Sequence, residues 1–334
     1  MNKYERLSVR RRLGLEIARK MQDELIEEHP LKQLFWECTL RCNLHCRHCG
    51  SDCKKVSDRP DMPKEVFLNV LDTIAQKTDP HKVFVIVTGG EPLMREDLEE
   101  CGAAIYQKGF PWGMVTNGLY LSHERFQRLL AAGLHTATVS LDGFAQEHNW
   151  MRGHSHSFDK AVNAIKCMAE TPGFIFDVVT CANNRNFPYL EELKEFLIEN
   201  GVKRWRIFTI FPVGRAANDP DLQLSGERFR EVMEFIKRSR KEGRIHVSYG
   251  CEGFLGNYEG EVRDHFFSCQ AGITVGSVLI NGAISGCPSI RADYHQGNIY
   301  EDDFMEVWER KFYPHRHRAV SYTHLRAHET SQDL

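Results

Sequence analysis

The stretch TLRCNLHCRHCG at residues 39–50 determines how the rest of the chain is interpreted. It follows directly on the apolar strand candidate LFWEC at 34–38. It places Cys42, Cys46 and Cys49 on one short polar loop with the spacing C-x3-C-x2-C. Three thiolates this close together can converge on a single metal centre. A zinc site usually has four ligands, whereas three closely spaced cysteines fit a [4Fe–4S] cluster that keeps one iron open.

The composition of the whole chain is that of a soluble globular protein. Its 334 residues are 42% hydrophobic and 27% charged, and the net charge of −3 shows no basic excess that would indicate a nucleic-acid partner. The longest apolar run, VFVIV at 83–87, is too short to cross a membrane. Five of the eleven cysteines fall between Cys38 and Cys53. With no signal peptide recognised, we expect a reducing, cytoplasmic location, where thiols are free or metal-bound. A fourth ligand, Cys38 or Cys53, would close the metal site, and this alternative stays open.

Strand and helix patterns alternate from residue 34 to residue 212, which predicts an α/β fold with a parallel sheet, either an open barrel or a doubly wound sheet. Ser122 and Ser225 are expected to cap helices, and Gly243 to follow the end of one. Polar motifs follow each strand: the cysteine loop, TGGEP, TNG, SLDG, CANN and FPVGR. The carboxyl ends of parallel strands are where such folds bind ligands, so we expect an enzyme. The strand candidates lie at 34–38, 82–88, 112–116, 136–141, 174–180 and 204–211.

The strand–helix rhythm breaks after residue 244, where glycines, short strand-like pieces and further cysteines predict a smaller module. The predicted organisation is an N-terminal helix (1–30), a barrel (31–216), a sixth helix with its connection (217–243), an α+β module (244–320) and a tail (321–334).

The cysteine loop together with GGEP at 89–92 resembles the radical S-adenosylmethionine (radical SAM) superfamily, and the similarity covers residues 34 to about 215. This resemblance implies a partial (β/α)6 TIM-like barrel and an enzyme that uses a [4Fe–4S] cluster and S-adenosyl-L-methionine (SAM). Cys42, Cys46 and Cys49 would ligate three irons, and the fourth iron would take the amino and carboxylate groups of SAM. Reductive cleavage would then give a 5′-deoxyadenosyl radical that abstracts hydrogen from a substrate.

The resemblance also implies which side chains bind SAM. Glycines let the backbone approach closely, a carboxylate accepts from an ammonium, and a guanidinium matches a carboxylate. The expected contacts are Gly89, Gly90 and Glu91 at the methionine amino group, Ser140 at the ribose, Asp142 at the ribose or only in its turn, Arg152 at the cofactor carboxylate, His48 near the adenine, and Asn117 in a turn or in the cofactor pocket.

A second group of cysteines, Cys251, Cys269 and Cys287, is similar to the opening of the SPASM extension, in which such cysteines hold an auxiliary iron–sulfur cluster. The resemblance implies a possible auxiliary [4Fe–4S] cluster here. A complete extension continues with more cysteines, and none follows Cys287. Residues 321–334 resemble translated sequencing-adapter read-through, so we expect a truncated module with a non-native tail.

The resemblance favours a peptide or protein side chain as substrate, as in the maturation of peptides or sulfatases. A flavodoxin or ferredoxin would supply electrons, and neither a nucleic acid nor membrane insertion is expected. Two alternatives remain: modification of a small molecule such as a tetrapyrrole side chain, and a non-enzymatic iron–sulfur protein that carries electrons or senses redox state.

Overall fold

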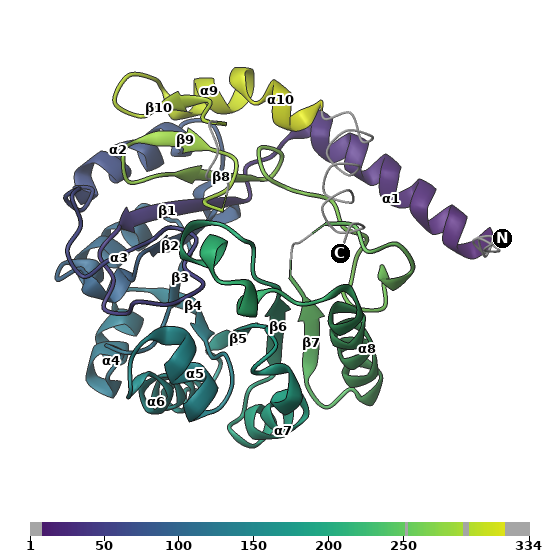
Figure 1. Cartoon of the computed structure of the whole chain (residues 1–334). Coiled ribbons are helices and arrows are strands. Elements are labelled where there is room, and N and C mark those ends of the chain that lie inside the picture. The colour runs from purple at the N-terminus through teal and green to yellow at the C-terminus, as the bar shows by residue number, and fades with distance from the viewer. Residues whose placement is uncertain (1–8, 251–252, 290–293, 318–334) are drawn as a thin grey trace.

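The computed structural model describes residues 9–250, 253–289 and 294–317. Their strands form one sheet in the order β10-β9-β8-β1-β2-β3-β4-β5-β6-β7 (Figure 1). The strands are β1 (Gln33–Thr39), β2 (Phe84–Gly89), β3 (Trp112–Thr116), β4 (Leu134–Ser140), β5 (Ile175–Cys181), β6 (Arg204–Phe208), β7 (His246–Tyr249), β8 (Val275–Val278), β9 (Ala283–Ser285) and β10 (Gly297–Asn298). The α-helices are α1 (Val9–Glu28), α2 (Lys64–Ala75), α3 (Leu98–Gln107), α4 (His123–Ala131), α5 (Ala145–Arg152), α6 (Ser157–Ala169), α7 (Leu190–Glu199), α8 (Gly226–Glu242), α9 (Phe304–Lys311) and α10 (Tyr313–Arg316).

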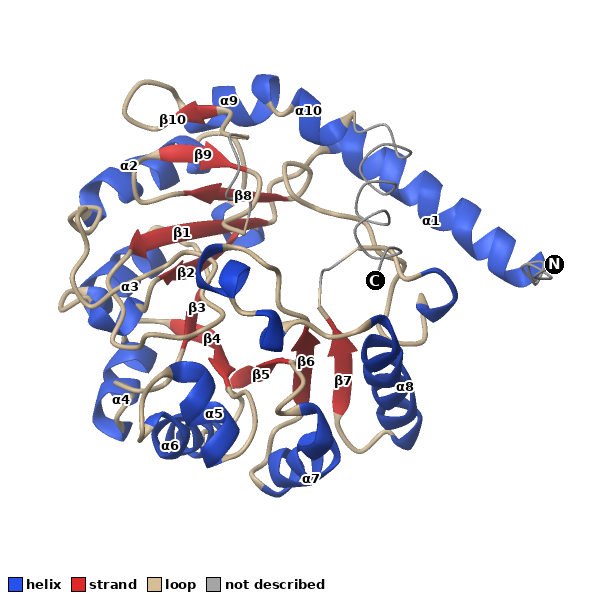
Figure 2. Cartoon of the chain, viewed as in Figure 1, coloured by secondary structure: helices blue, strands red, loops and turns tan. Residues whose placement is uncertain are grey.

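Strands β1 to β7 are parallel to their neighbours and curve into an open barrel. Helices α2, α3, α4, α6, α7 and α8 surround this curved sheet on its outer side (Figure 2). The predicted mixed α/β fold with a largely parallel sheet is therefore confirmed. Because the strands are parallel, the loops that follow them all gather at one end of the barrel, including the cysteine loop and the loop after β2.

The predicted helix boundaries rest on side-chain and glycine caps. The Ser122 side chain accepts from the Arg125 N–H, and the Ser225 side chain accepts from the Arg228 N–H. Gly243 ends α8 in the left-handed conformation at φ 69°. These three predictions are confirmed. The sixth predicted strand ran to residue 211, whereas β6 ends at Phe208 and the chain then turns across the barrel end.

The sheet continues beyond the six predicted strands at both ends. At one end β7 pairs in parallel with β6, and its Val247 is fully buried. At the other end β8 pairs in parallel with β1, and β9 and β10 follow as antiparallel strands. The sequence predicted a separate module from residue 244 onward. In the structure β7 still belongs to the barrel sheet, and only then does the chain return to pair β8 with β1.

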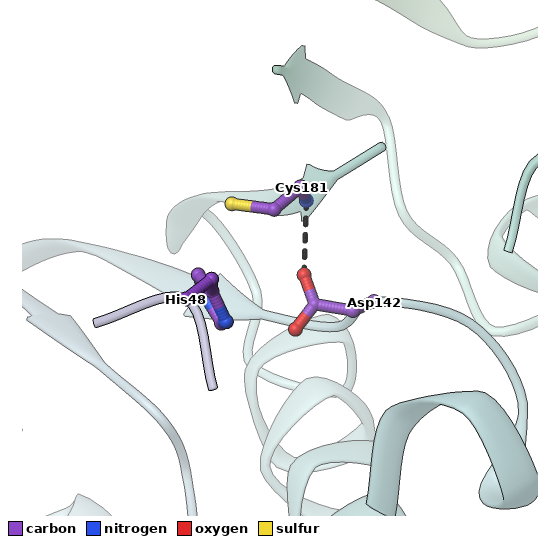
Figure 3. A group of neighbouring side chains, drawn as sticks. All are labelled: His48, Asp142 and Cys181. Atoms are coloured by element: carbon purple, nitrogen blue, oxygen red, sulfur yellow. Dashed lines mark hydrogen bonds between the residues drawn. The ribbon is translucent and has the colours of Figure 1, made fainter. Parts of the chain in front are cut away.

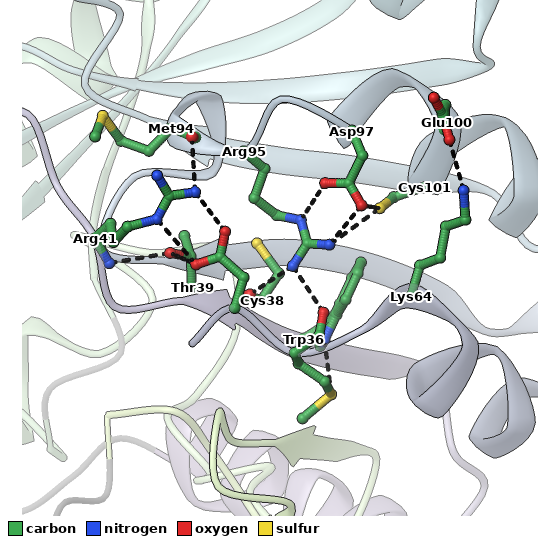
Figure 4. A network of polar contacts seen from close by, with 12 residues as sticks. Trp36, Cys38, Thr39, Arg41, Lys64, Met94, Arg95, Asp97, Glu100 and Cys101 are labelled. Carbon is green, nitrogen blue, oxygen red and sulfur yellow. Dashed lines mark hydrogen bonds and ion pairs between the residues drawn. The ribbon is translucent and has the colours of Figure 1, made fainter. Parts of the chain in front are cut away.

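A buried arginine ties the end of β1 to the loop after β2 (Figure 4). The Arg95 side chain is 3% exposed and lies over the Trp36 ring. Its guanidinium donates to the carbonyls of Cys38 at 2.9 Å and Met62 at 2.8 Å and forms an ion pair with Asp97 at 2.8 Å. These bonds fix both ends of the cysteine loop, because Cys38 precedes the loop and Met62 follows it.

Helix α1 extends away from the barrel at its N-terminal end (Figure 1). Among the residues described, no helix has both the length and the apolar character that crossing a bilayer requires.

Candidate active site

The cysteine loop folds onto itself at the end of β1, so that its thiols face inward. Cys42 and Cys46 are each 8% exposed and pack together with Leu119 and Cys53, and Cys49 lies against this group. The Cys42 N–H donates to the Lys54 carbonyl at 2.8 Å, which closes the loop at its base. The structure thus brings the three predicted ligands to one site.

The spread of the three sulfurs indicates the kind of centre they could hold. Among the residues described, only His48, Asp142 and Cys181 have ligand atoms that all lie within 4.8 Å of one another. The sulfurs of Cys42, Cys46 and Cys49 are therefore spread more widely than this. A single tetrahedral zinc ion with Zn–S bonds of about 2.3 Å would need sulfurs roughly 4 Å apart. In the described part of the chain the three thiols are therefore not arranged for a single tetrahedral zinc ion.

Two side chains direct N–H groups at sulfurs of the cysteine loop, and such hydrogen bonds tune the potential of an iron–sulfur centre. The Asn117 amide lies 3.9 Å from the Cys42 sulfur, and the Arg152 guanidinium lies 3.7 Å from the Cys46 sulfur. The Asn117 side chain also accepts from the Leu119 N–H at 2.9 Å. Asn117 therefore both forms a turn and contacts the cysteine loop, and its place in the cofactor pocket stays a prediction.

The environments of the three thiols differ. Burial raises the pKa of Cys42 to about 12 and also raises that of Cys46. A hydrogen bond with the Cys53 thiol lowers the pKa of Cys49 to about 5. Cys49 therefore gives up its proton more readily than Cys42 and Cys46, and metal ligation by thiolates requires those protons to leave.

The two open alternatives for a fourth ligand, Cys38 and Cys53, lie in different places. Cys38 is fully buried in the main hydrophobic core, beside Arg95 and Cys101. Cys53 packs within the cysteine loop. Of the two, only Cys53 lies among the cluster cysteines.

The GGE segment presses against the start of the cysteine loop. A Cβ atom on Gly89, whose φ is +149°, would lie 2.2 Å from the Thr39 carbonyl oxygen, and one on Gly90 would lie 2.4 Å from that of Arg41. Only glycine permits these approaches. The expected role of both glycines beside the methionine amino group stays a prediction.

Glu91 is 1% exposed, and protein donors surround its carboxylate. One oxygen accepts from the Thr116 hydroxyl at 2.7 Å and the Leu93 N–H at 3.1 Å, and the other accepts from the Asn117 N–H at 2.7 Å. Burial raises its pKa despite these bonds. The structure thus shows Glu91 holding the loops after β2 and β3 together, and its contact with SAM stays a prediction.

His48 in the cysteine loop, Asp142 in the loop after β4 and Cys181 at the end of β5 lie close together (Figure 3). One Asp142 oxygen accepts from the Cys181 N–H at 2.9 Å, and the other accepts from the Arg152 guanidinium at 2.7 Å. Burial by itself raises the pKa of Asp142, but the Arg152 charge together with His48, His148 and the hydrogen bond from the Cys181 N–H outweighs it and holds the pKa below its usual range. The ion pair fixes the turn after β4. The ribose contact of Asp142 and the cofactor contact of Arg152 stay predictions.

The imidazole of His48 lies beside this pair without a hydrogen-bond partner for its buried Nδ1 among the described residues. Burial, and then the charge of Arg152, lower its pKa to about 4, so the ring is neutral at pH 7. A neutral ring suits the expected position near an adenine. Ser140 ends β4, half-buried, and its ribose contact is equally untested.

Two further residues of this site were not singled out from the sequence. His148 Nδ1 accepts from the Asp142 N–H at 3.0 Å, and the Asn186 amide donates to the carbonyls of Asp142 and Cys181. Burial lowers the pKa of His148 to about 3. His148 lies within the quoted segment HNWMRG, and Asn186 comes shortly after CANN, but neither pattern indicates which backbone groups they support.

The predicted auxiliary site is only partly described. Cys251 lies outside the described residues, and Cys269 and Cys287 are half-buried. The segments that carry them lie close together, since a Cβ on Gly286 would lie 3.0 Å from the Gly272 nitrogen. Within the described part of the chain, no set of three close ligands forms around them. The auxiliary cluster stays a prediction.

Comparisons with known proteins agree with this geometry. Residues 36–197 match the Radical SAM superfamily. The AdoMet-dependent heme synthase of Nitratidesulfovibrio vulgaris is 26% identical over 295 residues, which cover 84% of this chain and 79% of that protein. The mycofactocin maturase MftC of Mycolicibacterium smegmatis is 28% identical over 288 residues, covering 83% and 69%. The fold resembles SuiB of Streptococcus suis bound to S-adenosylmethionine, with a TM-score of 0.68, 19% identity and coverage of 94% and 75%. The chain therefore carries a radical SAM domain at residues 36–197, which contain both the cysteine loop and the GGE segment.

Proposed function

We propose that this enzyme uses radical SAM chemistry to modify a side chain of a tetrapyrrole. The observation that carries the proposal is the extent of its similarity to AdoMet-dependent heme synthases. That similarity runs over 83% to 89% of this chain in three such relatives, and so continues beyond the radical SAM domain. The sequence alone favoured a peptide substrate, and the relatives support the tetrapyrrole alternative better.

The proposed roles at the barrel end follow from the contacts described. Cys42, Cys46 and Cys49 hold the [4Fe–4S] cluster, and Asn117 and Arg152 donate to their sulfurs. When bound, cluster and SAM together supply a 5′-deoxyadenosyl radical. The fixed Asp142–Arg152 pair lies beside the neutral His48 ring, and the half-buried Cys181 at the end of β5 lies close to Asp142 and His48.

The surroundings of Trp150 in α5 offer groups suited to a substrate that bears carboxylates. Two guanidinium groups lie over the Trp150 ring, that of Arg47 at 4.5 Å and that of Arg185 at 4.3 Å from its centroid. It packs against the same apolar cluster as Cys181. Arginine forks match carboxylates. Arginines at this position therefore support a substrate with acidic side chains, such as a tetrapyrrole.

The test uses anaerobically reconstituted protein with dithionite and SAM. We expect 5′-deoxyadenosine to form, and its yield to rise when an iron tetrapyrrole with acetate or propionate side chains is added. A mass change of the tetrapyrrole should depend on both SAM and dithionite. Cys42→Ala should abolish every product. A tetrapyrrole that neither shifts its absorption band on mixing nor changes mass would refute the proposed substrate.

A peptide substrate is the second candidate, because a mycofactocin maturase is also among the relatives. Short cysteine- or glycine-rich peptides encoded beside the gene are the probes for it. A mass change in such a peptide, with none in the tetrapyrroles, would favour this candidate.

A further inference from the structure

The segment after β6 lies across the cysteine loop and contains the motif FPVGR (211–215). It continues through two short 3-10 helices, η4 (Gly214–Asn218) and η5 (Pro220–Leu222). Together, residues 213–222 form what we call the strap. The functional roles discussed so far use none of its residues.

Arg215 makes four bonds to the cysteine loop. Its Nε donates to the Cys46 carbonyl at 2.6 Å, and its backbone N–H donates to the Cys49 carbonyl at 3.0 Å. Its Nη1 donates to the Cys53 carbonyl at 3.0 Å and to the Asp52 carboxylate at 2.7 Å. The side chain is 15% exposed. One residue thus holds the backbone of two cluster cysteines and of the cysteine that follows them.

Gly214 makes this approach possible. Its φ is +59°, and a Cβ there would lie 2.4 Å from the Cys49 carbonyl oxygen and 2.5 Å from that of Gly50. Any other residue would lift the strap from the loop. An ion pair also joins the two segments: the Arg47 guanidinium in the cysteine loop lies 2.9 Å from the Asp219 carboxylate in the strap.

We propose that Arg215 is a positioning residue for the iron–sulfur cluster: it sets the backbone that presents Cys46 and Cys49 to the metal, and it places a fixed positive charge beside the reduced cluster. Groups that orient ligands are a major determinant of how tightly a protein holds its metal. Nearby charge and hydrogen bonds set the reduction potential of an iron–sulfur cluster. Reduction adds negative charge, so a guanidinium at this place favours the reduced state.

The proposal predicts two separable effects of Arg215→Gln. Iron loss to a chelator should become faster by roughly tenfold, as expected for the loss of a group that orients metal ligands. The midpoint potential of the cluster, measured by redox titration with electron paramagnetic resonance, should become more negative. In the metal-free protein, hydrogen exchange at the amides of residues 46–53 should also accelerate.

Arg240→Gln is the matched control. The Arg240 side chain is 18% exposed and, like that of Arg215, bonds both backbone and an exposed carboxylate. It donates to one carbonyl, that of Val247, where Arg215 donates to two, and it pairs with Asp264, but it lies on α8. It should lower the thermal stability to a similar degree and leave iron loss and potential unchanged. If Arg215→Gln and Arg240→Gln show the same iron loss and the same potential, the proposal is overturned.

Arg215→Lys separates the two roles and remains informative if Arg215→Gln does not fold. Lysine keeps the charge but cannot bridge the Cys46 and Cys53 carbonyls with a fork. We expect a potential close to that of the unsubstituted enzyme together with accelerated iron loss. Iron loss as slow as in the unsubstituted enzyme would contradict the positioning role.

Discussion

Replacing Gly90 by alanine tests whether the GGE segment holds the cysteine loop in place by close packing. The φ of Gly90 is not in the positive range that disfavours alanine, so the cost of the substitution is purely steric. The added Cβ would lie 2.4 Å from the Arg41 carbonyl oxygen, 2.8 Å from the Arg41 carbonyl carbon and 2.9 Å from the Leu40 carbonyl oxygen. All three are backbone atoms, so no side chain can rotate away.

The size of the effect follows from these distances. Real Cβ contacts essentially never fall below 3.0 Å, so the backbone at Arg41 must retreat by at least 0.6 Å (3.0 − 2.4). Overpacking of this kind costs about 1–3 kcal/mol. The movement also loosens the hydrogen bond from the Glu91 N–H to the Arg41 carbonyl, now 2.9 Å long, at a cost of about 1 kcal/mol. We expect Gly90→Ala to lower the free energy of unfolding by about 2–4 kcal/mol and Tm by roughly 3–6 °C.

Moving the Arg41 backbone also displaces Cys42, the next residue in the chain. The variant should therefore take up less iron on anaerobic reconstitution. Iron per chain and the thermal melt of the metal-free protein are the two measurements. Gly14→Ala is the control. Gly14 lies within α1, and a Cβ there would meet only the Phe266 ring, at an ordinary contact distance of 3.7 Å. The substitution should be neutral or slightly stabilising. Iron content equal to that of the control, with a Tm within roughly 2 °C of it, would refute this reasoning.

Three further predictions concern single side chains around the site. Arg95→Met leaves the Cys38 carbonyl and a second buried carbonyl without their donor, and should lower the free energy of unfolding in urea by about 3–5 kcal/mol; a loss below about 1 kcal/mol would show that these bonds matter little. His148 has a pKa of about 3 in the folded state, against an ordinary value of 6.5. Between pH 3 and 6.5 the ring therefore binds a proton only in the unfolded chain, so the free energy of unfolding falls as the pH drops through this range. His148→Asn keeps an acceptor for the Asp142 N–H and should make urea-derived stability less steep with pH by about 1.4 kcal/mol per unit in that window; identical slopes would contradict this. Cys53→Ser should keep the iron content of the unsubstituted enzyme, and loss of iron comparable to that of Cys42→Ala would make Cys53 a fourth ligand.

Much of the fold could be predicted from local patterns in the sequence. Strand β3 is an apolar run because residues on both of its faces are buried, and Ser122 and Ser225 mark helix starts because their side chains bond the first free N–H groups. The pairing of β8 with β1 was not predictable in this way. It joins residues about 240 positions apart, and Val275–Val278 is too short to carry a distinctive pattern.

The candidate site shows the same division. Three cysteines on one loop could be recognised because their spacing alone brings them together. The partners of Glu91 and Arg152 could not, since a carboxylate suited to an ammonium is equally suited to a hydroxyl and two N–H groups, and a guanidinium suited to a ligand carboxylate is equally suited to Asp142. Arg215 escaped notice for a related reason: its targets are carbonyl oxygens, which every residue has.

The position of β1 has a consequence for how this protein can be divided. β1 carries the cysteine loop at its end and has hydrogen-bonded neighbours on both sides, β2 from the barrel and β8 from the C-terminal part of the chain. A fragment cut after the barrel would leave one edge of β1 bare, and bare edges recruit foreign strands and promote aggregation. The C-terminal hairpin of β8 and β9 therefore supports the strand that carries the cysteine loop. Exchanging this hairpin between related enzymes would change the packing beside the cysteine loop as well as any contact with substrate.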